Sequence, residues 1–413
     1  MNFYKYQGKY LFSLEKFSEF EKISSAECFS NNDIIYFIGR LDPMSSKDSF
    51  CLTCPSLMYL EKENLDILKV NSFNKKINYP LVKKIYDRKI KFINANKTNW
   101  KDNLNYNFPK KWKINILALG DVGSTLLIGL KLLGKKYIDE IGIYDKSENN
   151  TKRWEKELGQ IVFPFEDGKL PQVNVVNYDN LFDCDMFVFC ATKKVPSLDS
   201  KVEDVRMLQF EENSKIVEEY AKLARKNNFK GFFSVVSDPV DLLCKKVFLA
   251  SNTNNRGEFD GLGLPGEKIK GYGLGVMNAR ASYYSEKSKE TKNYPEEGRA
   301  FGPHGKGLVI ANSIANYNEN FSNYLTEKAL RENIEIRKLG YKPYIGPALS
   351  SGAISIINTI SNEWHYSSNF IGGVFMGSKN RNLESGLEFE KLNFPKELYE
   401  KIKVTYENLK GII

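Results

Sequence analysis

The sequence predicts an α/β protein built around a parallel, doubly wound sheet. Three observations support this prediction: apolar strand-like runs alternate with helical patterns from Trp112 onward, a glycine-containing turn follows the first run, and an acidic residue closes the second. Strands and helices that alternate in this way pack as βαβ units. We expect a Rossmann-type sheet, followed by a mixed α/β catalytic domain and preceded by a small α+β N-terminal domain.

The stretch from Ile114 to Asp145 has the order strand, tight turn, helix, strand and acid. The turn holds Gly120, Asp121, Val122 and Gly123. We expect Gly120 to allow a sharp turn and Gly123 to allow close packing of the helix on the strand. The helix N-terminus would then offer free N–H groups and a positive dipole end to a pyrophosphate. The pattern indicates a dinucleotide site, although Ala118 stands where the first glycine is usual, and an ordinary βαβ turn is the alternative.

Asp145 is the candidate for binding the ribose of the dinucleotide. It follows Gly123 by 145 − 123 = 22 residues, close to the roughly 20 expected for the acid that accepts ribose hydroxyls. A carboxylate here would repel a 2′-phosphate, which favours NAD over NADP. Lys146, Lys152 and Arg153 nearby weaken this preference, so NADP is not excluded.

Composition narrows the class of protein. The 413 residues carry 60 basic and 51 acidic side chains, for a formal charge of +9. The lysines are scattered, which argues against nucleic-acid binding and suits an anionic substrate or cofactor. No apolar run approaches the roughly 18 residues of a membrane span, and charges interrupt the N-terminal stretch. We therefore expect no membrane association. The six cysteines show no disulfide spacing, which favours a cytoplasmic location.

Three domains are expected. Residues 1–110 form an extra unit of unknown role, with a strand at Asp33 to Ile38 and a strand pair at Leu57 to Leu60 and Leu65 to Val70. A linker runs from Asn94 to Pro109. The Rossmann domain is expected at 111–255 and the catalytic domain at 256–413.

In the N-terminal unit, the only residues that suggest a reactive or metal-binding site are Cys51 and Cys54. A redox-active cysteine pair usually lies in a βαβ unit. A zinc site requires four ligands, and besides these two cysteines the segment offers only Cys28. Two small buried thiols are the simplest interpretation, and no metal site is expected.

Within the second and third domains the apolar pattern assigns most elements. Helices are expected at Thr151 to Gln160, from the loop 192–203 to Asn227, at Gly352 to Ile360 and at Pro395 to Leu409. Strands are expected at Val173 to Val176, Met186 to Cys190, Phe232 to Val236 and Phe370 to Met376, and a strand and turn lead into a helix at Ile269 to Arg280. Asp238 follows the strand that ends at Val236, where such sheets place their ligands.

The chain has two histidines, His304 and His365. His304 lies in GPHGKG, and its glycine neighbours suit an exposed turn more than a packed core. We therefore interpret His304 as a general acid or base. His365 follows a helix, and we expect it to cap that helix or lie on the surface.

Several motifs, in order, resemble the lactate/malate dehydrogenase family: GDVGS, DVRMLQFEENSKIV, VVSDPVD, MNAR and PHG. The resemblance runs from about Lys113 to the C-terminus, and the residues before it have no counterpart in that family. Arg280 and His304 are 304 − 280 = 24 residues apart, the separation that the family shows between its carboxylate-binding arginine and its catalytic histidine.

The resemblance implies a role for each matching position. His304 would donate a proton to the substrate carbonyl, Arg280 would hold the substrate carboxylate with Asn278 beside it, and Arg206 would polarise the carbonyl oxygen. The glycine turn and Ala191 would contact NAD, which exchanges a hydride with the substrate.

The chain departs from the family pattern at three places. Met277 stands where the family has the aspartate that pairs with the catalytic histidine. Asp238 stands where the family has an asparagine, and we hypothesise that Asp238 supports His304 instead. The loop from Ala191 to Arg206 is longer than in the family, so Lys193, Lys194 and Lys201 are candidates for selecting an anionic substrate.

The sequence therefore predicts an NAD(P)-dependent dehydrogenase that transfers a hydride to or from a 2-oxo or 2-hydroxy acid, or a related anionic carbonyl or imine. A homodimer or homotetramer is expected. The alternative is a catalytically impaired dinucleotide-binding scaffold whose N-terminal domain engages a protein or peptide partner.

Overall fold

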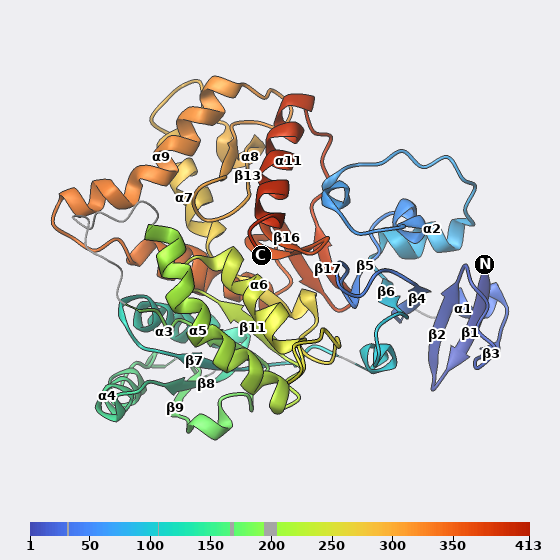
Figure 1. The fold of residues 1–413 in the computed structure, drawn as a ribbon, viewed down its shortest axis with the longest axis horizontal. Coiled ribbons are helices and arrows are strands. Elements are labelled where there is room, and N and C mark those ends of the chain that lie inside the picture. The colour runs from blue at the N-terminus through green and yellow to red at the C-terminus, as the bar shows by residue number, and fades with distance from the viewer. Residues whose placement is uncertain (31–32, 106, 166–168, 194–204) are drawn as a thin grey trace.

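The computed structural model describes residues 1–30, 33–105, 107–165, 169–193 and 205–413, without the side chains of Val205 and Arg206. A nine-stranded sheet forms the centre of the molecule (Figure 1), in the order β17-β16-β15-β12-β11-β10-β7-β8-β9. The strands are β7 (Trp112–Leu117), β8 (Ile138–Tyr144), β9 (Gln172–Val175), β10 (Met186–Phe189), β11 (Phe232–Val235), β12 (Ile269–Gly271), β15 (His365–Ile371), β16 (Val374–Leu383) and β17 (Gly386–Phe389). The six strands from β9 to β12 are parallel. This order confirms the predicted doubly wound sheet.

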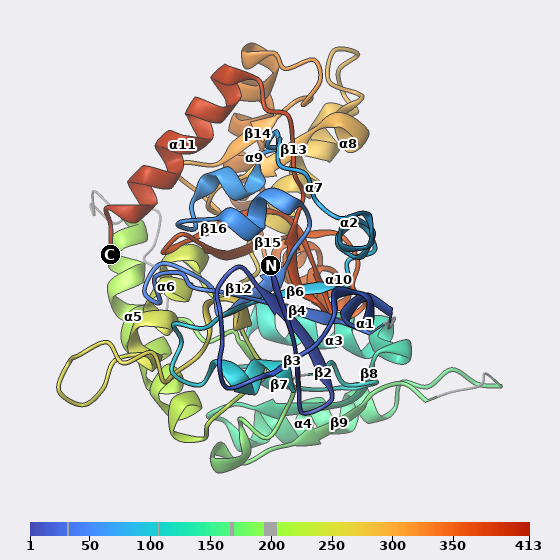
Figure 2. The ribbon, with the colours of Figure 1, turned by 90° about the vertical axis from the view of Figure 1, so that its right-hand side faces the viewer.

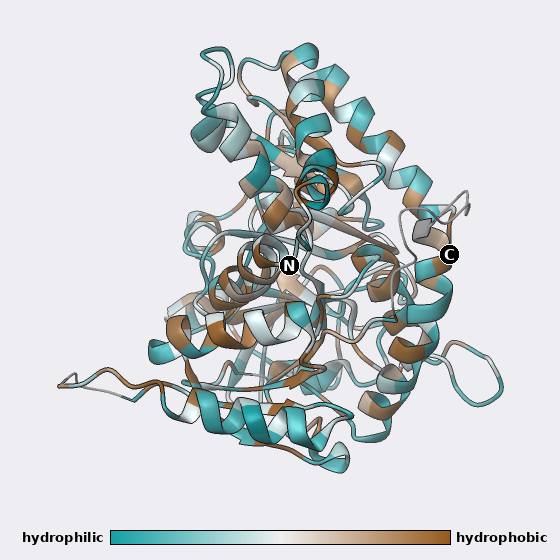
Figure 3. Ribbon diagram, turned by 90° about the vertical axis from the view of Figure 1, so that its left-hand side faces the viewer, coloured by the Kyte–Doolittle hydropathy of each residue, from teal (hydrophilic) through white to brown (hydrophobic). Residues whose placement is uncertain are grey.

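Helices cover both faces of the parallel strands. On one face lie α3 (Asp121–Leu133), α4 (Glu148–Gly159) and α10 (Ile354–Ile360), and on the other lie α5 (Val205–Lys226) and α6 (Val240–Ser251). Alternation within β10 shows why: Met186 and Val188 join the core beneath α3, whereas Phe187 and Phe189 join the core beneath α5 and α6. A strand whose residues are apolar on both sides must be covered on both faces. The outer helices accordingly carry hydrophilic and hydrophobic stripes (Figure 3).

The C-terminal third extends the sheet and adds a helical layer beside it. Strands β15, β16 and β17 are antiparallel. The other elements are α7 (Leu274–Ser285), α8 (Tyr294–Glu297), the pair β13 (Arg299–Phe301) and β14 (Val309–Ala311), α9 (Glu319–Lys338), the π-helical segment η7 (Pro347–Ala353) and α11 (Lys396–Lys410). Figure 1 shows α7 and α9 side by side at the end away from β9.

Residues before β7 form a second, mixed sheet in the order β3-β1-β2-β4-β6-β5. Its elements are β1 (Asn2–Tyr6), β2 (Lys9–Ser13), β3 (Glu21–Lys22), α1 (Ser25–Ser30), β4 (Ile35–Gly39), β5 (Ser49–Cys51), η1 (Pro55–Tyr59), η2 (Leu65–Leu68), α2 (Tyr79–Tyr86), β6 (Ile90–Asn94) and η3 (Trp100–Leu104). Figure 1 shows this sheet as a lobe of its own beside β16 and β17, and Figure 2 views the molecule from the side of this lobe. Its core nevertheless continues into that of the C-terminal strands.

Three local predictions are wrong. Leu57 to Leu60 and Leu65 to Val70 do not form a strand pair, because both segments form short 3-10 helices, η1 and η2. Phe370 to Met376 is not one strand, since Gly372 and Gly373 take φ of 56° and 87° and turn β15 into β16. His365 is neither a cap nor a surface residue: it is 5% exposed and begins β15.

A helix that spans a bilayer needs about 20 mostly apolar residues. None among the described residues is both long and apolar enough to cross a membrane.

Candidate functional site

The turn after β7 has the geometry of a phosphate-binding turn, but the glycine roles differ from expectation. Ala118 takes the left-handed conformation, with φ of +73°. Gly120 has an ordinary φ of −72°, so the prediction that Gly120 makes the sharp turn is wrong. A Cβ on Gly120 would meet no atom within 4 Å, whereas a Cβ on Gly123 would lie 2.0 Å from the carbonyl oxygen of Ala118. Gly123 therefore allows the close packing of helix on strand that was predicted.

The N-terminus of α3 opens from this turn. Gly120 precedes the helix, and no described side chain caps its first turn. The first N–H groups of a helix have no partner within it, and they favour an anion. Asp121 is exposed and pairs with Lys342 at 2.8 Å, which offsets its negative charge, and Val122 is half-buried. The open space beside Gly120 and the uncapped helix end fit a pyrophosphate.

Asp145 directly follows β8 and lies beside this turn. Its Oδ2 accepts the Leu119 N–H at 2.8 Å, and its Oδ1 accepts the Ser147 N–H at 3.0 Å. Each carboxylate oxygen keeps a second lone pair, so the predicted acceptance of ribose hydroxyls is compatible with these bonds. Ala191 follows β10, partly exposed.

His304 and Asp238 form a hydrogen-bonded pair. His304 Nδ1 lies 3.0 Å from Asp238 Oδ1, and the histidine side chain is 10% exposed. The second ring nitrogen, Nε2, is buried and has no hydrogen-bond partner among the described residues. An imidazole held at one nitrogen by a carboxylate can exchange a proton with a ligand at the other nitrogen when that atom has no protein partner.

The surrounding chain fixes both partners of this pair. Asp238 follows β11, and Asn213 of α5 donates to its carbonyl oxygen at 2.7 Å. The His304 main-chain N–H donates to the buried Asp241 carboxylate of α6 at 3.2 Å. Gly273, which precedes α7, has no room for a side chain, because a Cβ there would lie 2.7 Å from His304 Cβ. Asp241 was part of the VVSDPVD motif, yet no role was predicted for it.

Met277 occupies the position expected for a carboxylate. It is 3% exposed, packs in the core beneath α7, and its sulfur lies 3.9 Å from Nη1 of Arg280. A thioether cannot accept a strong hydrogen bond from an imidazole. The carboxylate that contacts His304 thus comes from the end of β11 in place of α7.

Arg280 is buried on α7 at 7% exposure. Its Nη1 donates to the Ala329 carbonyl oxygen at 3.1 Å, and its Nη2 donates to the Asn333 side chain. Burial lowers the pKa of Arg280, while the negative charges of Glu332 and Asp238 oppose that shift. None of the ion pairs among the described residues involves Arg280.

Among the described residues, neither Asn278 nor Lys193 joins this pair. Asn278 accepts from the Tyr294 hydroxyl at 2.9 Å and faces a different cavity, of about 320 Å³, beside Trp364. Lys193 pairs with Glu212 and lowers the pKa of that carboxyl to about 2. The side chain of Arg206 lies outside the described residues, as do Lys194 and Lys201. Their roles stay predictions.

Sequence patterns did not indicate the apolar hollow that borders Arg280. This hollow, the α7–α9 trough, has a volume of about 570 Å³ and lies between α7, α9, the segment 339–347 and Ser350. Its walls are mainly apolar and aromatic, including Val276, Tyr283, Ile336, Leu339, Tyr341 and Tyr344. The segment after α9 lacks periodicity, so only tertiary packing brings it to α7.

Cys51 and Cys54 show no sign of a metal or redox centre. Cys51 is buried and accepts from the Ser385 hydroxyl at 3.3 Å, and burial raises the pKa of its thiol to about 12. Cys54 lies 3.1 Å from the Ser56 hydroxyl. Both thiols are free, and the described residues contain no cluster of three metal-ligating side chains.

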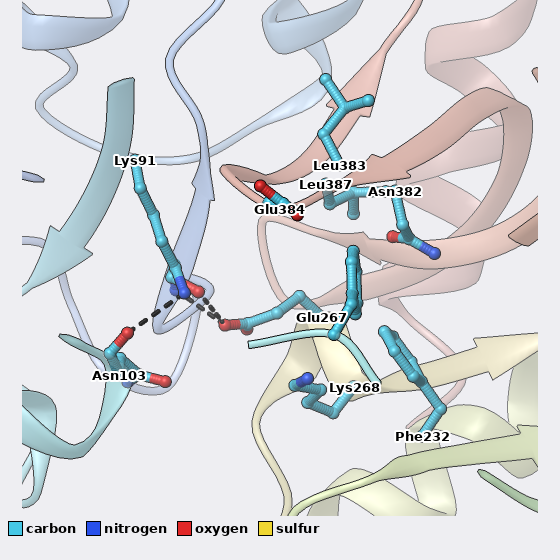
Figure 4. Close-up of a pocket in the computed structure, with 12 residues that line it drawn as sticks. Lys91, Asn103, Phe232, Glu267, Lys268, Asn382, Leu383, Glu384 and Leu387 are labelled. Carbon is cyan, nitrogen blue, oxygen red and sulfur yellow. Dashed lines mark hydrogen bonds between the residues drawn. The ribbon is translucent and has the colours of Figure 1, made fainter. Parts of the chain in front are cut away.

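A second charged site lies at the junction between the N-terminal sheet and the main sheet. Figure 4 shows Lys91 of β6 extending toward Glu267, which precedes β12, in a small cavity of about 30 Å³. Lys91 donates to the Asn103 carbonyl oxygen at 3.1 Å, and Glu267 accepts from the Ser49 N–H at 2.7 Å. Burial lowers the pKa of Lys91 to about 8. The cavity has room for little more than water. It lies between the two sheets, and neither His304 nor Asp238 lines it.

Residues 112–259 match the family model described as lactate/malate dehydrogenase, NAD binding domain. The L-lactate dehydrogenase of Staphylococcus haemolyticus is 26% identical over 203 residues, which cover 49% of this chain and 58% of that enzyme. The L-lactate dehydrogenase of Borrelia turicatae is 23% identical over 337 residues, which cover 74% and 98%. The chain thus spans little more than half the length of the staphylococcal relative.

Solved structures share the fold. A lactate dehydrogenase from a Medee basin deep-sea metagenome library superposes with a TM-score of 0.60 at 16% identity, covering 73% of this chain and 98% of that one. The malate dehydrogenase of Plasmodium falciparum superposes with a TM-score of 0.56 at 19% identity, covering 72% and 96%. These matches confirm the Rossmann architecture, and the N-terminal sheet lies before the part that the family model matches.

Proposed function

We propose that the whole chain is an NAD-dependent oxidoreductase of a 2-hydroxy acid and its 2-oxo counterpart, because residues 112–259 match the family model described as lactate/malate dehydrogenase, NAD binding domain. The observation that supports this proposal most directly is the His304–Asp238 pair, in which Nε2 of the histidine has no hydrogen-bond partner among the described residues. The pair supplies a proton-exchanging group of the kind that reduction of a carbonyl requires.

Each residue of the site has a separate role in the proposed reduction of the carbonyl. A bound NADH would supply the hydride that adds to the carbonyl carbon. His304 donates a proton from Nε2 to the carbonyl oxygen as charge develops there, and takes it back in the reverse direction. Asp238 accepts the Nδ1–H, which orients the ring and stabilises the imidazolium form. Arg280 pairs with the substrate carboxylate, and Arg206 polarises the carbonyl oxygen.

The cofactor preference follows from Asp145. Its carboxylate faces the Leu119 end of the turn, where the adenosine ribose would lie, and it would repel a 2′-phosphate. We therefore propose NAD in preference to NADP. Assembly as a homodimer or homotetramer belongs to the same proposal, and sedimentation velocity tests it.

The experiment is an absorbance assay of NADH and NADPH oxidation with a panel of 2-oxo acids. We expect turnover with NADH, a fall of at least 100-fold in kcat for His304→Asn, and a large rise in KM for Arg280→Ala. Asp238→Asn keeps the hydrogen bond but removes the charge, so kcat should fall at least tenfold while the Kd for NADH stays unchanged. Turnover that survives both His304→Asn and Arg280→Ala, or a normal kcat for Asp238→Asn, would contradict this assignment.

A further inference from the structure

The charges in the α7–α9 trough are unequally neutralised. Glu332 accepts from the Tyr284 hydroxyl, and Lys342 pairs with Asp121 at 2.8 Å. Within the described structure, Arg280 hydrogen-bonds only to uncharged acceptors: the oxygens of Ala329 and Asn333 and the sulfur of Met277. A buried guanidinium with no carboxylate within ion-pair distance favours an anion, because the charge is otherwise poorly compensated.

The walls around this charge suit an apolar body. Tyr283, Leu339 and Tyr341 are 55%, 70% and 73% exposed, an unusual exposure for large side chains that lie side by side along one hollow. The volume of about 570 Å³ lies within the range of small-molecule pockets. It far exceeds what a substrate with a methyl side chain would fill.

The trough also borders the proposed reaction site. Lys342, in its wall, reaches Asp121 at the start of α3, the helix that follows the glycine turn. Arg280 lies close enough to Asp238, the partner of His304, for the negative charge of Asp238 to act on the guanidinium. A ligand whose carboxylate meets Arg280 could therefore extend along the trough while its carbonyl faces His304.

We propose that the substrate is a 2-oxo or 2-hydroxy acid with a bulky, uncharged apolar body, aromatic or branched aliphatic, that lies in the α7–α9 trough. This inference rests on the proposed function and names the substrate class of the same site. Lys193 does not favour an acidic side chain in its place, since Glu212 already pairs with it. Each buried methylene raises affinity about fourfold.

The test compares NADH oxidation with pyruvate, oxaloacetate, 2-oxo-4-methylpentanoate and phenylpyruvate. We expect kcat/KM for phenylpyruvate or 2-oxo-4-methylpentanoate to exceed that for pyruvate and oxaloacetate at least tenfold. A preference for pyruvate or oxaloacetate would overturn the inference and leave the proposed function standing. If NADH binds, as fluorescence reports, but no panel member turns over, the proposed function itself fails.

A matched pair of variants locates the selectivity. Ile336 lines the trough, whereas Ile334, on the same helix α9 and 45% exposed, does not. Ile336→Glu should lower the ratio of kcat/KM for phenylpyruvate to that for pyruvate at least tenfold, while Ile334→Glu leaves the ratio unchanged. An unchanged ratio in Ile336→Glu together with a smaller sedimentation coefficient would identify the trough as an interface between copies and overturn the proposal.

Discussion

Ala118 occupies a backbone conformation that glycine adopts more readily. Its φ of +73° lies in the left-handed region, which costs a residue with a Cβ about 1–2 kcal/mol. Replacing it by glycine removes that strain, although the greater freedom of glycine in the unfolded chain returns about 0.4–1 kcal/mol. We expect Ala118→Gly to raise the free energy of unfolding by about 0.5–1 kcal/mol, as urea denaturation would measure.

A second substitution of alanine by glycine serves as the control, because it shows how an alanine without strain responds. Ala353 has an ordinary helical φ of −58° and is fully buried. Ala353→Gly should lower the free energy of unfolding by about 1 kcal/mol or more. If Ala118→Gly lowers the free energy of unfolding to the same extent, the left-handed conformation of Ala118 is not strained.

At the residue scale, the sequence predicted the pairing of His304 with Asp238 because Met277 replaces the carboxylate that the family pairs with its histidine, while Asp238 adds a carboxylate where the family has an asparagine. The conformation of Ala118 was not predicted, since a glycine pattern with one alanine leaves open which residue turns. The partner of Arg280 was not predicted either. Asn333 and Ala329 lie about 50 residues away on α9, and only packing brings them to α7.

At the element scale, strands with strong apolar runs were predicted within one or two residues, as for β10 and β11. Short apolar runs were ambiguous: Leu57 to Leu60 and Leu65 to Leu68 fit a strand and a 3-10 helix equally well, and tertiary contacts decided for the helix. His365 was misplaced because its position after a helix suggested a cap or a surface residue, yet β15 lies between β12 and β16 and buries it.

The burial of His365 in β15 makes the stability of the protein pH-dependent. Its Nδ1 donates to the Glu363 carbonyl oxygen at 3.0 Å, so the neutral ring accepts at Nε2, beside Thr359 and Ser367. Burial, and secondarily the charge of Lys270, lowers the pKa of His365 to about 3. Between pH 6.5 and 3 the unfolded chain binds a proton that the folded chain does not, so stability falls as the pH falls.

We expect this histidine to remove about 2 kcal/mol of stability between pH 6.5 and pH 5. His365→Gln cannot take up the proton, so its free energy of unfolding should fall less over this range, although the variant starts lower at pH 7. Urea denaturation of both proteins at the two pH values measures the difference. Parallel pH dependence in wild type and variant would show that His365 does not take up the proton on unfolding.

At the scale of the whole molecule, the N-terminal sheet is joined to the main sheet by buried ionic groups. Lys47 and Glu63 pair with fully buried side chains. Lys47 Nζ also donates to the Phe370 carbonyl oxygen at 3.0 Å, and Glu63 accepts the Gly372 N–H at 3.1 Å. Phe370 lies near the end of β15 and Gly372 lies in the turn to β16, so the pair fastens the residues before β7 to the C-terminal strands.

Breaking this pair should therefore destabilise both parts together. Lys47→Met or Glu63→Gln leaves one buried group without its partner, which costs about 3–5 kcal/mol, whereas the double variant should cost less than the sum of the two. Far-ultraviolet circular dichroism and tryptophan fluorescence should report one coincident urea transition in each variant, because one apolar core spans both sheets. Lys83→Met, which removes an exposed ion pair with Asp87, serves as the control and should leave the midpoint unchanged. Two separate transitions in the wild type would instead mean that the N-terminal sheet folds independently and that the junction does not couple them.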